Sequence, residues 1–354
     1  MVFHLNTRRE ISGCLSSLGR ATCIQMSSEV ASNAADKAGA WTIIERNIAR
    51  AVTLIEQACE SDAPPRLVVL PEFVFQGPPR ATPASQWIER ACATVPGPIT
   101  QRLGELARRR GIYIAGNHFE VDPRWPDRYF NTSFLLDPAG EVILRYRRIN
   151  TASWTSPHDI LDAYRDAYGE DGIFPVADTP LGRLAIFPCG EVNIPELSRV
   201  FMLRGAEVLL HPHNGPVTAP SEAAKTCRAA ENMCYLVSAN VAGGIGFSAD
   251  GSEQGGHSGI VDYLGNDAAR DAGPDETVAV SAIIDVEALR EARRDQGMGN
   301  MLMRSRFELY RDHYAKAEFY PANGLAGGAF ETYPELTPLQ ERALANMTRA
   351  GVIR

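Results

Sequence analysis

Apolar residues along the chain fall into two spacings, one typical of helices and the other of buried strands. Residues 38–60 carry apolar side chains at helical spacing, which predicts an amphipathic helix that Pro64 and Pro65 terminate. The apolar run at 67–70 is continuous and has the length of a strand covered on both faces. A shorter run at 20–26 predicts a strand before the helix.

The same order of elements continues along the chain. The pattern predicts further helices at 100–110, 195–204 and about 219–234, and strands at 112–115, 131–136, 141–146, 182–187, 207–210 and 235–240. The turn-type sequence Asp-Pro-Ala-Gly at 137–140 joins two of these strands as a hairpin. Helices that alternate with apolar strands predict an α/β fold.

The chain shows no change in composition that would mark a linker between domains. We therefore expect one domain over residues 20–310, preceded by an N-terminal arm at 1–19. Residues 311–354 are expected to form a C-terminal extension that packs on the body of the protein or on a partner subunit. The glycine-rich stretches at 243–259 and 324–328 are expected to be loops.

Composition and charge exclude several classes of protein. Of the 354 residues, 45% are hydrophobic and 22% are charged, which is ordinary globular usage. The 35 Lys and Arg against 43 Asp and Glu give a net charge of −8, so no nucleic-acid partner is expected. No apolar window approaches the ~18 residues of a membrane span. The seven scattered cysteines form no Cys-x-x-Cys pair, so we expect a cytoplasmic protein without a disulfide framework or a zinc site.

Glu72 is the first residue with a pattern that indicates chemistry. It follows the apolar run at 67–70 and is flanked by Pro71 and Phe73. A carboxylate at the end of a buried strand is partly desolvated, which raises its pKa towards the range of a general base. The alternative is a solvated loop residue or a helix cap.

Cys189 is the second such residue, because it ends a predicted strand a few residues before a predicted helix. Backbone N–H groups and a helix terminus at such a junction are expected to lower the pKa of the thiol and favour the nucleophilic thiolate. The N–H of Gly190 could contribute to an oxyanion hole. The alternative is a buried cysteine that acts as a small hydrophobe. Cys227 and Cys234, seven residues apart, are interpreted as such core residues, whereas Lys225 is expected to face solvent.

Three cations, Arg145, Arg147 and Arg148, end a predicted hairpin strand. A cation at the reaction centre would stabilise a developing oxyanion, and three of them would favour an anionic substrate. The alternative is that arginines on a strand are solvated or paired with acids.

Taken together, these segments resemble the carbon–nitrogen hydrolase (nitrilase) superfamily, in the order that the family has them, from about residue 20 to about 310. Leu-Pro-Glu-Phe at 70–73 matches the motif of the family's general base, and Cys-Gly-Glu-Val-Asn-Ile-Pro-Glu at 189–196 matches its nucleophile motif. Phe-Asn-Thr-Ser at 130–133, followed by the hairpin and Tyr-Arg-Arg-Ile, matches the segment that ends at the family's catalytic lysine. Similar later signatures are Arg-Ala-Ala-Glu-Asn at 228–232, Ser-Ala-Asn at 238–240 and His-Ser-Gly-Ile-Val-Asp at 257–262.

The resemblance implies a four-layer α-β-β-α sandwich, no metal or organic cofactor, and a homodimer or larger homo-oligomer. It also implies that Glu72 is the base and Cys189 the nucleophile, which forms a thioester acyl-enzyme that water then hydrolyses. Candidate substrate-binding residues are Gly190, Glu191, His213 and Asn214.

Two positions depart from the family pattern. Arg148 stands where the family has lysine; it keeps the positive charge but cannot shuttle a proton near pH 7. The family's supporting glutamate precedes the cysteine by some 20–25 residues, and there the sequence offers Asp166 at the closer spacing and Glu170 with the expected residue type. Both stay candidates.

The resemblance predicts a hydrolase that acts on a carbon–nitrogen bond other than a peptide bond, in a small amide or an N-carbamoyl compound. Three different functions stay compatible with the sequence: a nitrilase that acts on a nitrile, an enzyme that transfers the acyl group to an amine, and a catalytically silent binding or regulatory member of the fold. The sequence does not identify the substrate.

Overall fold

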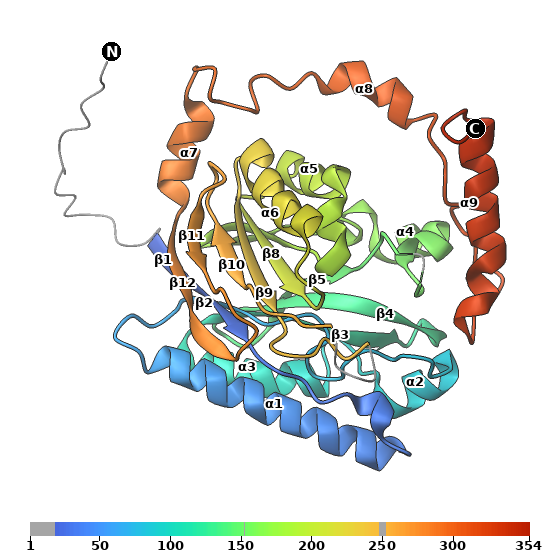
Figure 1. Ribbon diagram of the computed structural model, residues 1–354, viewed down its shortest axis with the longest axis horizontal. Coiled ribbons are helices and arrows are strands. Elements are labelled where there is room, and N and C mark those ends of the chain that lie inside the picture. The colour runs from blue at the N-terminus through green and yellow to red at the C-terminus, as the bar shows by residue number, and fades with distance from the viewer. Residues whose placement is uncertain (1–17, 152, 248–252) are drawn as a thin grey trace.

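Two six-stranded sheets form the centre of the computed structural model, which describes residues 18–151, 153–247 and 253–354 (Figure 1). The predicted arm at residues 1–19 lies outside the described residues, except for its last two, which belong to the first strand. The first sheet has the strand order β12-β1-β2-β3-β4-β5. Its strands are β1 (Leu18–Gln25), β2 (Leu67–Val69), β3 (Tyr113–Asp122), β4 (Trp125–Leu136), β5 (Val142–Arg147) and β12 (Thr277–Asp285).

The second sheet has the order β11-β10-β9-β8-β7-β6. Its strands are β6 (Ala177–Thr179), β7 (Gly182–Ile186), β8 (Val208–His213), β9 (Tyr235–Asn240), β10 (Gly259–Val261) and β11 (Asp267–Arg270). In each sheet three central strands run parallel, namely β1, β2 and β3 in the first and β7, β8 and β9 in the second. Their carboxyl ends are where an α/β fold places its ligands.

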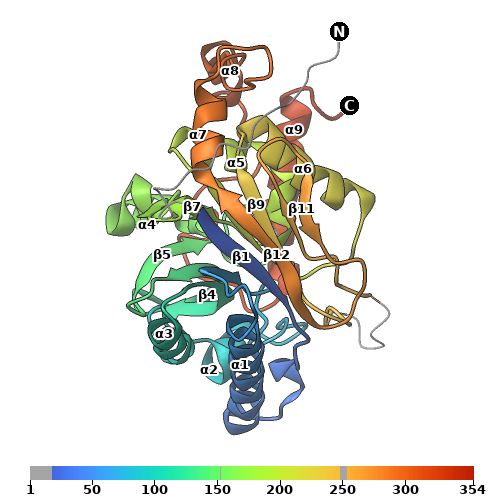
Figure 2. The same ribbon diagram turned by 90° about the vertical axis from the view of Figure 1, so that its left-hand side faces the viewer.

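Helices cover the outer face of each sheet (Figures 1 and 2). The first sheet carries α1 (Lys37–Cys59), α2 (Ala84–Ala91) and α3 (Pro98–Arg110), and the second carries α5 (Pro195–Leu203) and α6 (Ala219–Asn232). The predicted four-layer α-β-β-α sandwich is thereby confirmed. The predicted helices and strands of the core are confirmed too, and most ends differ by a few residues. Two strands run much longer than predicted: the one predicted at 112–115, as β3, and the one predicted at 131–136, as β4.

β2 shows why a continuous apolar run marks a strand inside this sandwich. Leu67 and Val69 belong to the core between the two sheets, whereas Val68 and Leu70 belong to the core under α1 and α3. Successive side chains of a strand point to opposite faces, so a strand covered on both sides is apolar at every position.

The inward face of α6 differs from the one expected. The interpretation of Cys227 as a core residue is wrong, because its side chain is exposed; Cys234, just beyond the helix, is buried. Lys225 does not face solvent either: it is only 2% exposed, and its Nζ lies 2.6 Å from Oε1 of Glu222. Its alkyl chain packs inward, and its charge is compensated by an acid on the same helix.

The chain beyond the second sheet forms α7 (Val286–Arg294), α8 (Phe307–Tyr314) and α9 (Thr337–Arg349). These helices pass along the outside of the sandwich to the carboxyl end (Figure 1). The segment around 320–335 is hydrogen-bonded to this same chain: the N–H groups of Asn323 and Leu325 donate to the carbonyls of His158 and Asp159 at 2.9 and 3.0 Å. Among the described residues no helix is long and apolar enough to cross a membrane.

Candidate active site

Glu72 lies just beyond the end of β2. Its N–H donates to the carbonyl of His213, the last residue of β8 in the other sheet, at 3.2 Å. The next residue, Phe73, has a left-handed backbone with φ 32°, and its N–H donates to Oδ1 of Asn117 at 2.9 Å. The side chain of Glu72 is 0% exposed. Backbone contacts to both sheets therefore hold this carboxylate at a fixed, desolvated position between them.

One oxygen of Glu72 is saturated with donors and the other is not. Nδ2 of Asn131 donates to Oε1 at 2.7 Å, and Nη1 of Arg148 donates to the same oxygen at 3.3 Å. Asn131 is held in turn by Nδ2 of Asn117, which donates to its Oδ1 at 2.7 Å. Oε2 is buried and has no partner in hydrogen-bond geometry among the described residues. This oxygen is available to take up a proton.

Cys189 begins a short 3-10 turn (Cys189–Asn193) after β7. Its backbone is left-handed, with φ 49°, and its carbonyl lies 2.8 Å from Nε2 of His211. The thiol donates to the carbonyl of Asn214 at 3.5 Å and faces the Glu72 carboxylate closely enough that each group shifts the pKa of the other. A left-handed residue at a strand end is strained and needs the surrounding structure to hold it, which is typical of functional positions.

The pKa values of the pair place the proton on sulfur. Burial raises the pKa of Glu72 to about 7, although Arg148 and Asn131 favour the charged carboxylate. Burial, reinforced by the Glu72 carboxylate, raises the pKa of the Cys189 thiol to about 12. The expected lowering of the thiol pKa is therefore wrong: α5 begins only at Pro195, and desolvation outweighs the neighbouring cation. Cys189 thus needs a base to become a nucleophile, and Glu72 titrates in the range where a carboxylate serves as one.

Arg148 follows β5 and brings a cation to the same place. Its N–H donates to the carbonyl of Asn131 at 2.9 Å, and its side chain, 14% exposed, lies with Cζ 5.5 Å from the ring centre of Trp154. A Cβ added to Gly190 would lie 3.2 Å from Nη2 of Arg148, so the guanidinium lies beside the residue that follows Cys189. The nearby acids raise the pKa of Arg148, and it stays charged.

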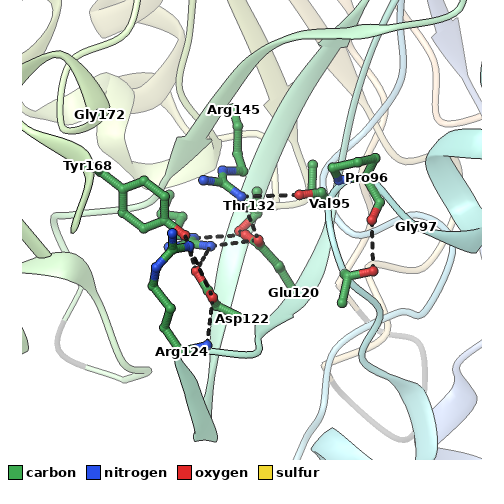
Figure 3. A network of polar contacts seen from close by, with 12 residues as sticks. Val95, Pro96, Gly97, Glu120, Asp122, Arg124, Thr132, Arg145, Tyr168 and Gly172 are labelled. Atoms are coloured by element: carbon green, nitrogen blue, oxygen red, sulfur yellow. Dashed lines mark hydrogen bonds and ion pairs between the residues drawn. The ribbon is translucent and has the colours of Figure 1, made fainter.

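The other two arginines of this strand serve a different purpose. Arg147 points to the opposite face of the sheet, where it donates to Glu120 at 2.7 and 2.8 Å and to Asp122 at 2.7 Å. Arg145 donates to the carbonyl of Val95 at 3.1 Å and to Glu120 at 3.4 Å (Figure 3). The expectation of an anionic substrate counted all three cations. Only Arg148 faces Glu72, so that expectation loses its basis.

Glu191 is buried behind the site. Its Oε1 accepts hydrogen bonds from the N–H of Ile149 at 3.1 Å and from the N–H and Nδ2 of Asn150 at 2.8 and 3.0 Å. The hydroxyl of Tyr146 donates to the same carboxylate at 2.9 Å. Glu191 therefore joins the turn that carries Cys189 to the turn that carries Arg148, and it does not line the cavity described below.

The structure brings some of the other predicted residues to the site and not others. Asn214 lines the cavity, and its Oδ1 is buried without a partner among the described residues. His213 lies below it, stacked on His211 at 5.1 Å, and burial holds its pKa well below the usual range. Asp166, on α4 (Leu161–Tyr168), and Glu170, just after it, are both exposed and do not line the cavity. Glu170 pairs with Arg165 at 2.6 Å.

Sequence reasoning gave no role to Asn117 and Asn131, which hold Glu72 from β3 and β4. One signal could have found them: two amides in strands that are otherwise buried need partners inside the protein. Among the described residues, no group of three His, Cys, Asp or Glu side chains is arranged to hold a metal ion.

A cavity of about 750 Å³ opens above these groups. Glu72, Arg148, Cys189 and Asn214 contribute to its lining, together with the aromatic side chains Tyr129, Trp154, Phe247, Phe330 and Tyr333. Residues 330–334 come from the C-terminal segment, so parts of the chain far apart in sequence share this cavity. A cavity of this size with a few convergent polar groups is typical of small-molecule sites.

The same architecture occurs in solved structures of nitrilase-superfamily proteins. A carbon–nitrogen hydrolase from Helicobacter pylori G27 aligns with a TM-score of 0.63 and 20% identity over 84% of this chain and 98% of that one. A mutant of the amidase from Nesterenkonia sp. AN1, with the acetamide moiety of fluoroacetamide covalently added at its active-site cysteine, aligns with a TM-score of 0.60 and 20% identity over 85% of this chain and 98% of that one.

Sequence comparison gives the family directly. The carbon–nitrogen hydrolase family model matches residues 20–294, and the chain belongs to this family. Omega-amidase NIT2 from Xenopus tropicalis is 29% identical over 250 residues, which are 70% of this chain and 86% of that protein. The predicted family is thereby confirmed, and the protein is a hydrolase acting on carbon–nitrogen bonds other than peptide bonds.

Proposed function

We propose that this protein hydrolyses the carbon–nitrogen bond of an amide or an N-carbamoyl compound through a thioester on Cys189. One observation carries the proposal: the thiol, the Glu72 carboxylate and the Arg148 guanidinium lie together on the lining of one cavity. The amidases among the relatives support the choice of an amide over other carbon–nitrogen compounds.

In the proposed acylation, the Glu72 carboxylate takes the Sγ proton while Sγ of Cys189 attacks the carbonyl carbon. The carbonyl oxygen becomes an oxyanion, which the Arg148 charge and the N–H of Gly190 stabilise. When the intermediate collapses, the carbon–nitrogen bond breaks, and the leaving nitrogen takes the proton from Glu72 and departs as ammonia or an amine. A thioester remains, and Glu72 is again a carboxylate.

In the proposed deacylation, Glu72 takes a proton from a water molecule that attacks the thioester carbon. The carbon–sulfur bond then breaks, and the sulfur recovers the proton from Glu72 as the acid product leaves. The raised pKa of Glu72 suits both halves of the cycle, because a group that titrates near 7 can accept and return a proton at neutral pH. Besides water and substrate, the groups that act in this cycle are side chains and a backbone N–H of this chain.

Arg148 acts in this proposal by charge alone. A guanidinium does not give up its proton at neutral pH, so it cannot relay protons as an amine can. Its contact with Trp154 and its hydrogen bond to Glu72 fix its position, which is what electrostatic stabilisation of an oxyanion requires.

The experiment that tests the proposal traps the acyl-enzyme. The protein is incubated with amides, N-carbamoyl compounds and nitriles, and its intact mass and the release of ammonia are measured. We expect an adduct that is absent from Cys189→Ala and present in Cys227→Ala, which removes an exposed cysteine outside the cavity. If no compound gives an adduct or ammonia, the protein is a catalytically silent binding member of the fold.

The same panel of compounds distinguishes amide hydrolysis from nitrile hydrolysis and from acyl transfer. A nitrilase would turn over nitriles faster than the matching amides. An acyl transferase would give new amides when an amine acceptor is added, instead of the acid alone. The buried Glu72 carboxylate beside the strained Cys189 turn favours hydrolysis over a silent role, because a protein that only binds does not need a base next to a thiol.

We also propose that the protein works in the cytoplasm as a homodimer or a larger homo-oligomer. The six cysteines in the described part of the chain are all free, which fits a reducing compartment. Large apolar side chains on α8 and the neighbouring α5 are exposed, among them Leu203, Leu309 and Tyr314, and a second copy would cover them. Light scattering after size-exclusion chromatography tests the assembly, and a monomer at micromolar concentration would contradict it.

A further inference from the structure

The walls of the active-site cavity are aromatic. Trp154 and Phe247 both pack edge-on against Phe73, with ring centres 6.1 and 6.0 Å away, so the residue next to Glu72 supports both rings. Phe247 is 41% exposed although it lines a cavity. Exposed aromatic surface inside a cavity is apolar area that a ligand can cover.

The C-terminal segment supplies the facing wall. The N–H of Ala84 donates to the carbonyl of Glu331 at 2.9 Å, and the N–H and hydroxyl of Ser85 donate to its carboxylate at 3.1 and 2.9 Å. These bonds tie the segment to the start of α2 and place Tyr333, which is 54% exposed, on the cavity lining. This segment lies beyond the part of the chain that the family model matches, so it is a feature of this chain added to the family core.

The charged side chains on the cavity lining balance one another, so the lining favours neither an anionic nor a cationic substrate. Arg148 at the base of the cavity is already paired with Glu72, and the outer lining carries one acid, Glu331, and one further base, Arg80. Arg80 donates two hydrogen bonds, to the carbonyl of Gly246 at 2.7 Å and to Oδ1 of Asn33 at 2.8 Å. The charged groups of the lining thus have partners, and the aromatic surface of the cavity is the feature that a ligand would cover.

We propose that the substrate is an uncharged amide whose acyl part carries an aromatic ring, which lies against Trp154, Phe247 and Tyr333. This inference rests on the proposed function and names its substrate class. An aromatic ring packed against another ring gains more binding free energy than its buried apolar area alone supplies. A cavity of about 750 Å³ has room for such an acyl group beside the reacting carbonyl. A formamide-sized substrate would leave the exposed rings in water.

The test compares three amides that differ only in the group next to the acyl carbon: 2-phenylacetamide, 2-cyclohexylacetamide and acetamide. We expect kcat/KM to be about two- to tenfold higher for the phenyl than for the cyclohexyl compound, the range that aromatic pairs supply. Tyr333→Leu and Phe247→Leu, which keep apolar bulk but remove a ring, should bring that ratio towards one. Tyr310→Leu is the matched control, because Tyr310 is also 54% exposed but lies on α8 outside this cavity. It should keep the ratio of the unchanged protein.

A small electrophile separates failure of this inference from failure of the proposed function. Fluoroacetamide carries no ring and reports only the reactivity of the nucleophile. If it labels Cys189 but the phenyl and cyclohexyl amides are turned over equally, the aromatic substrate class is overturned and the proposed function stands. If Tyr310→Leu lowers the ratio as much as Tyr333→Leu, the assignment of the ring site to this cavity is overturned. If neither fluoroacetamide nor any amide reacts, the proposed function fails and this inference falls with it.

Discussion

Asn131 and Arg148 donate to the same oxygen of Glu72, Oε1, at 2.7 and 3.3 Å, and Arg148 is tied by its own N–H to the carbonyl of Asn131. The amide and the guanidinium thus act as one unit at the end of the β4–β5 hairpin. Both favour the charged carboxylate, against the burial that favours the protonated one. The balance between them sets the pH at which Glu72 becomes a base.

The first prediction concerns Arg148. Arg148→Met should lower kcat/KM by about 100-fold or more, since loss of one group that stabilises an oxyanion typically costs ~10²–10³. Arg148→Lys keeps the charge but loses the flat contact with Trp154, so its loss should be smaller. Steady-state kinetics with an amide turned over by the unchanged protein measures both. Arg46→Met, on the exposed face of α1, serves as the control. Equal activity of Arg148→Met and the unchanged protein would remove Arg148 from the mechanism.

The second prediction is the pH profile. Since the pKa of Glu72 is about 7 and that of Cys189 about 12, kcat/KM should rise with pH around 7 and then stay level to at least pH 9. In Asn131→Ala the carboxylate loses a hydrogen bond that favours its charged form, so the midpoint should move to higher pH. Profiles of kcat/KM between pH 5 and 9 measure the shift. An unchanged midpoint in Asn131→Ala would contradict the assignment of this limb to Glu72.

The third prediction links Glu72 to stability. Its pKa rises from 4.5 to about 7 on folding, so the folded state holds the proton more tightly. The stability contributed by Glu72 is fully present below pH 4.5 and is lost as pH rises through 7. Glu72→Gln has no such loss. Relative to the unchanged protein, its free energy of unfolding should gain on the order of 3 kcal/mol between pH 4.5 and 8, at about 1.4 kcal/mol per pKa unit.

Urea unfolding at pH 4.5 and pH 8 measures this difference. Glu45→Gln, on the exposed face of α1, is the control, and its effect should be the same at both pH values. A Glu72→Gln variant whose relative stability does not change with pH would mean that the carboxylate is not desolvated in the folded protein.

The fourth prediction concerns Glu191 as a positioning residue. Glu191→Ala removes the acceptor that three donors of the 149–150 turn and Tyr146 share, and should cost about 2–4 kcal/mol in stability. It should also lower kcat, because Arg148 lies on that turn. Glu191→Gln keeps an oxygen where Oε1 lies, and its amide nitrogen at the other position can donate to the hydroxyl of Tyr146. It should therefore keep most of the stability and most of the kcat of the unchanged protein. Thermal unfolding and kcat of the two variants test this prediction. Equal losses in both would mean that the negative charge of Glu191 matters and not the shape of its side chain.

The fifth prediction concerns the network under β5. Glu120→Ala leaves the buried Arg147 with Asp122 as its remaining acid and should destabilise the protein by about 3–5 kcal/mol. The double variant Glu120→Leu with Arg147→Met removes both of these charges and leaves Asp122 its hydrogen bonds from the N–H of Arg124 and the hydroxyl of Tyr168. It should therefore recover much of that loss. Denaturant unfolding measures the three free energies. A double variant as unstable as Glu120→Ala would contradict the charge explanation.

The motifs of the candidate site could be located from the sequence because each lies at the end of an apolar strand. Glu72 and Cys189 follow β2, which is apolar throughout, and β7, which ends in the apolar run Leu-Ala-Ile; these runs mark both as central strands. Central parallel strands carry their functional groups at their carboxyl ends, so the ends of two such strands suffice to indicate a shared site. The hairpin pattern likewise placed Arg148 at the end of β5, although it did not show which way its two neighbours point.

The parts that sequence did not predict depend on contacts between distant segments. The directions of Arg145 and Arg147 follow from the register of β5 against β4, which local pattern does not show. The pKa of Cys189 depends on how deeply the turn is buried and on the nearby Glu72 carboxylate, which only the tertiary structure brings close to it. The distance along the chain from Cys189 indicates Asp166 and Glu170, but α4 and the turn after it carry them to the surface.

Residues 330–334 stand apart from the catalytic framework in one respect: they reach it from outside the sandwich, and the backbone and side chain of one residue, Glu331, bind them to α2. In the proposed function, chemistry and selectivity are therefore encoded in separable stretches of the gene. Under the proposed function, we expect that exchanging the codons of this C-terminal stretch between homologues redirects the enzyme to other substrates and leaves its reaction unchanged, a modular route to new specificity.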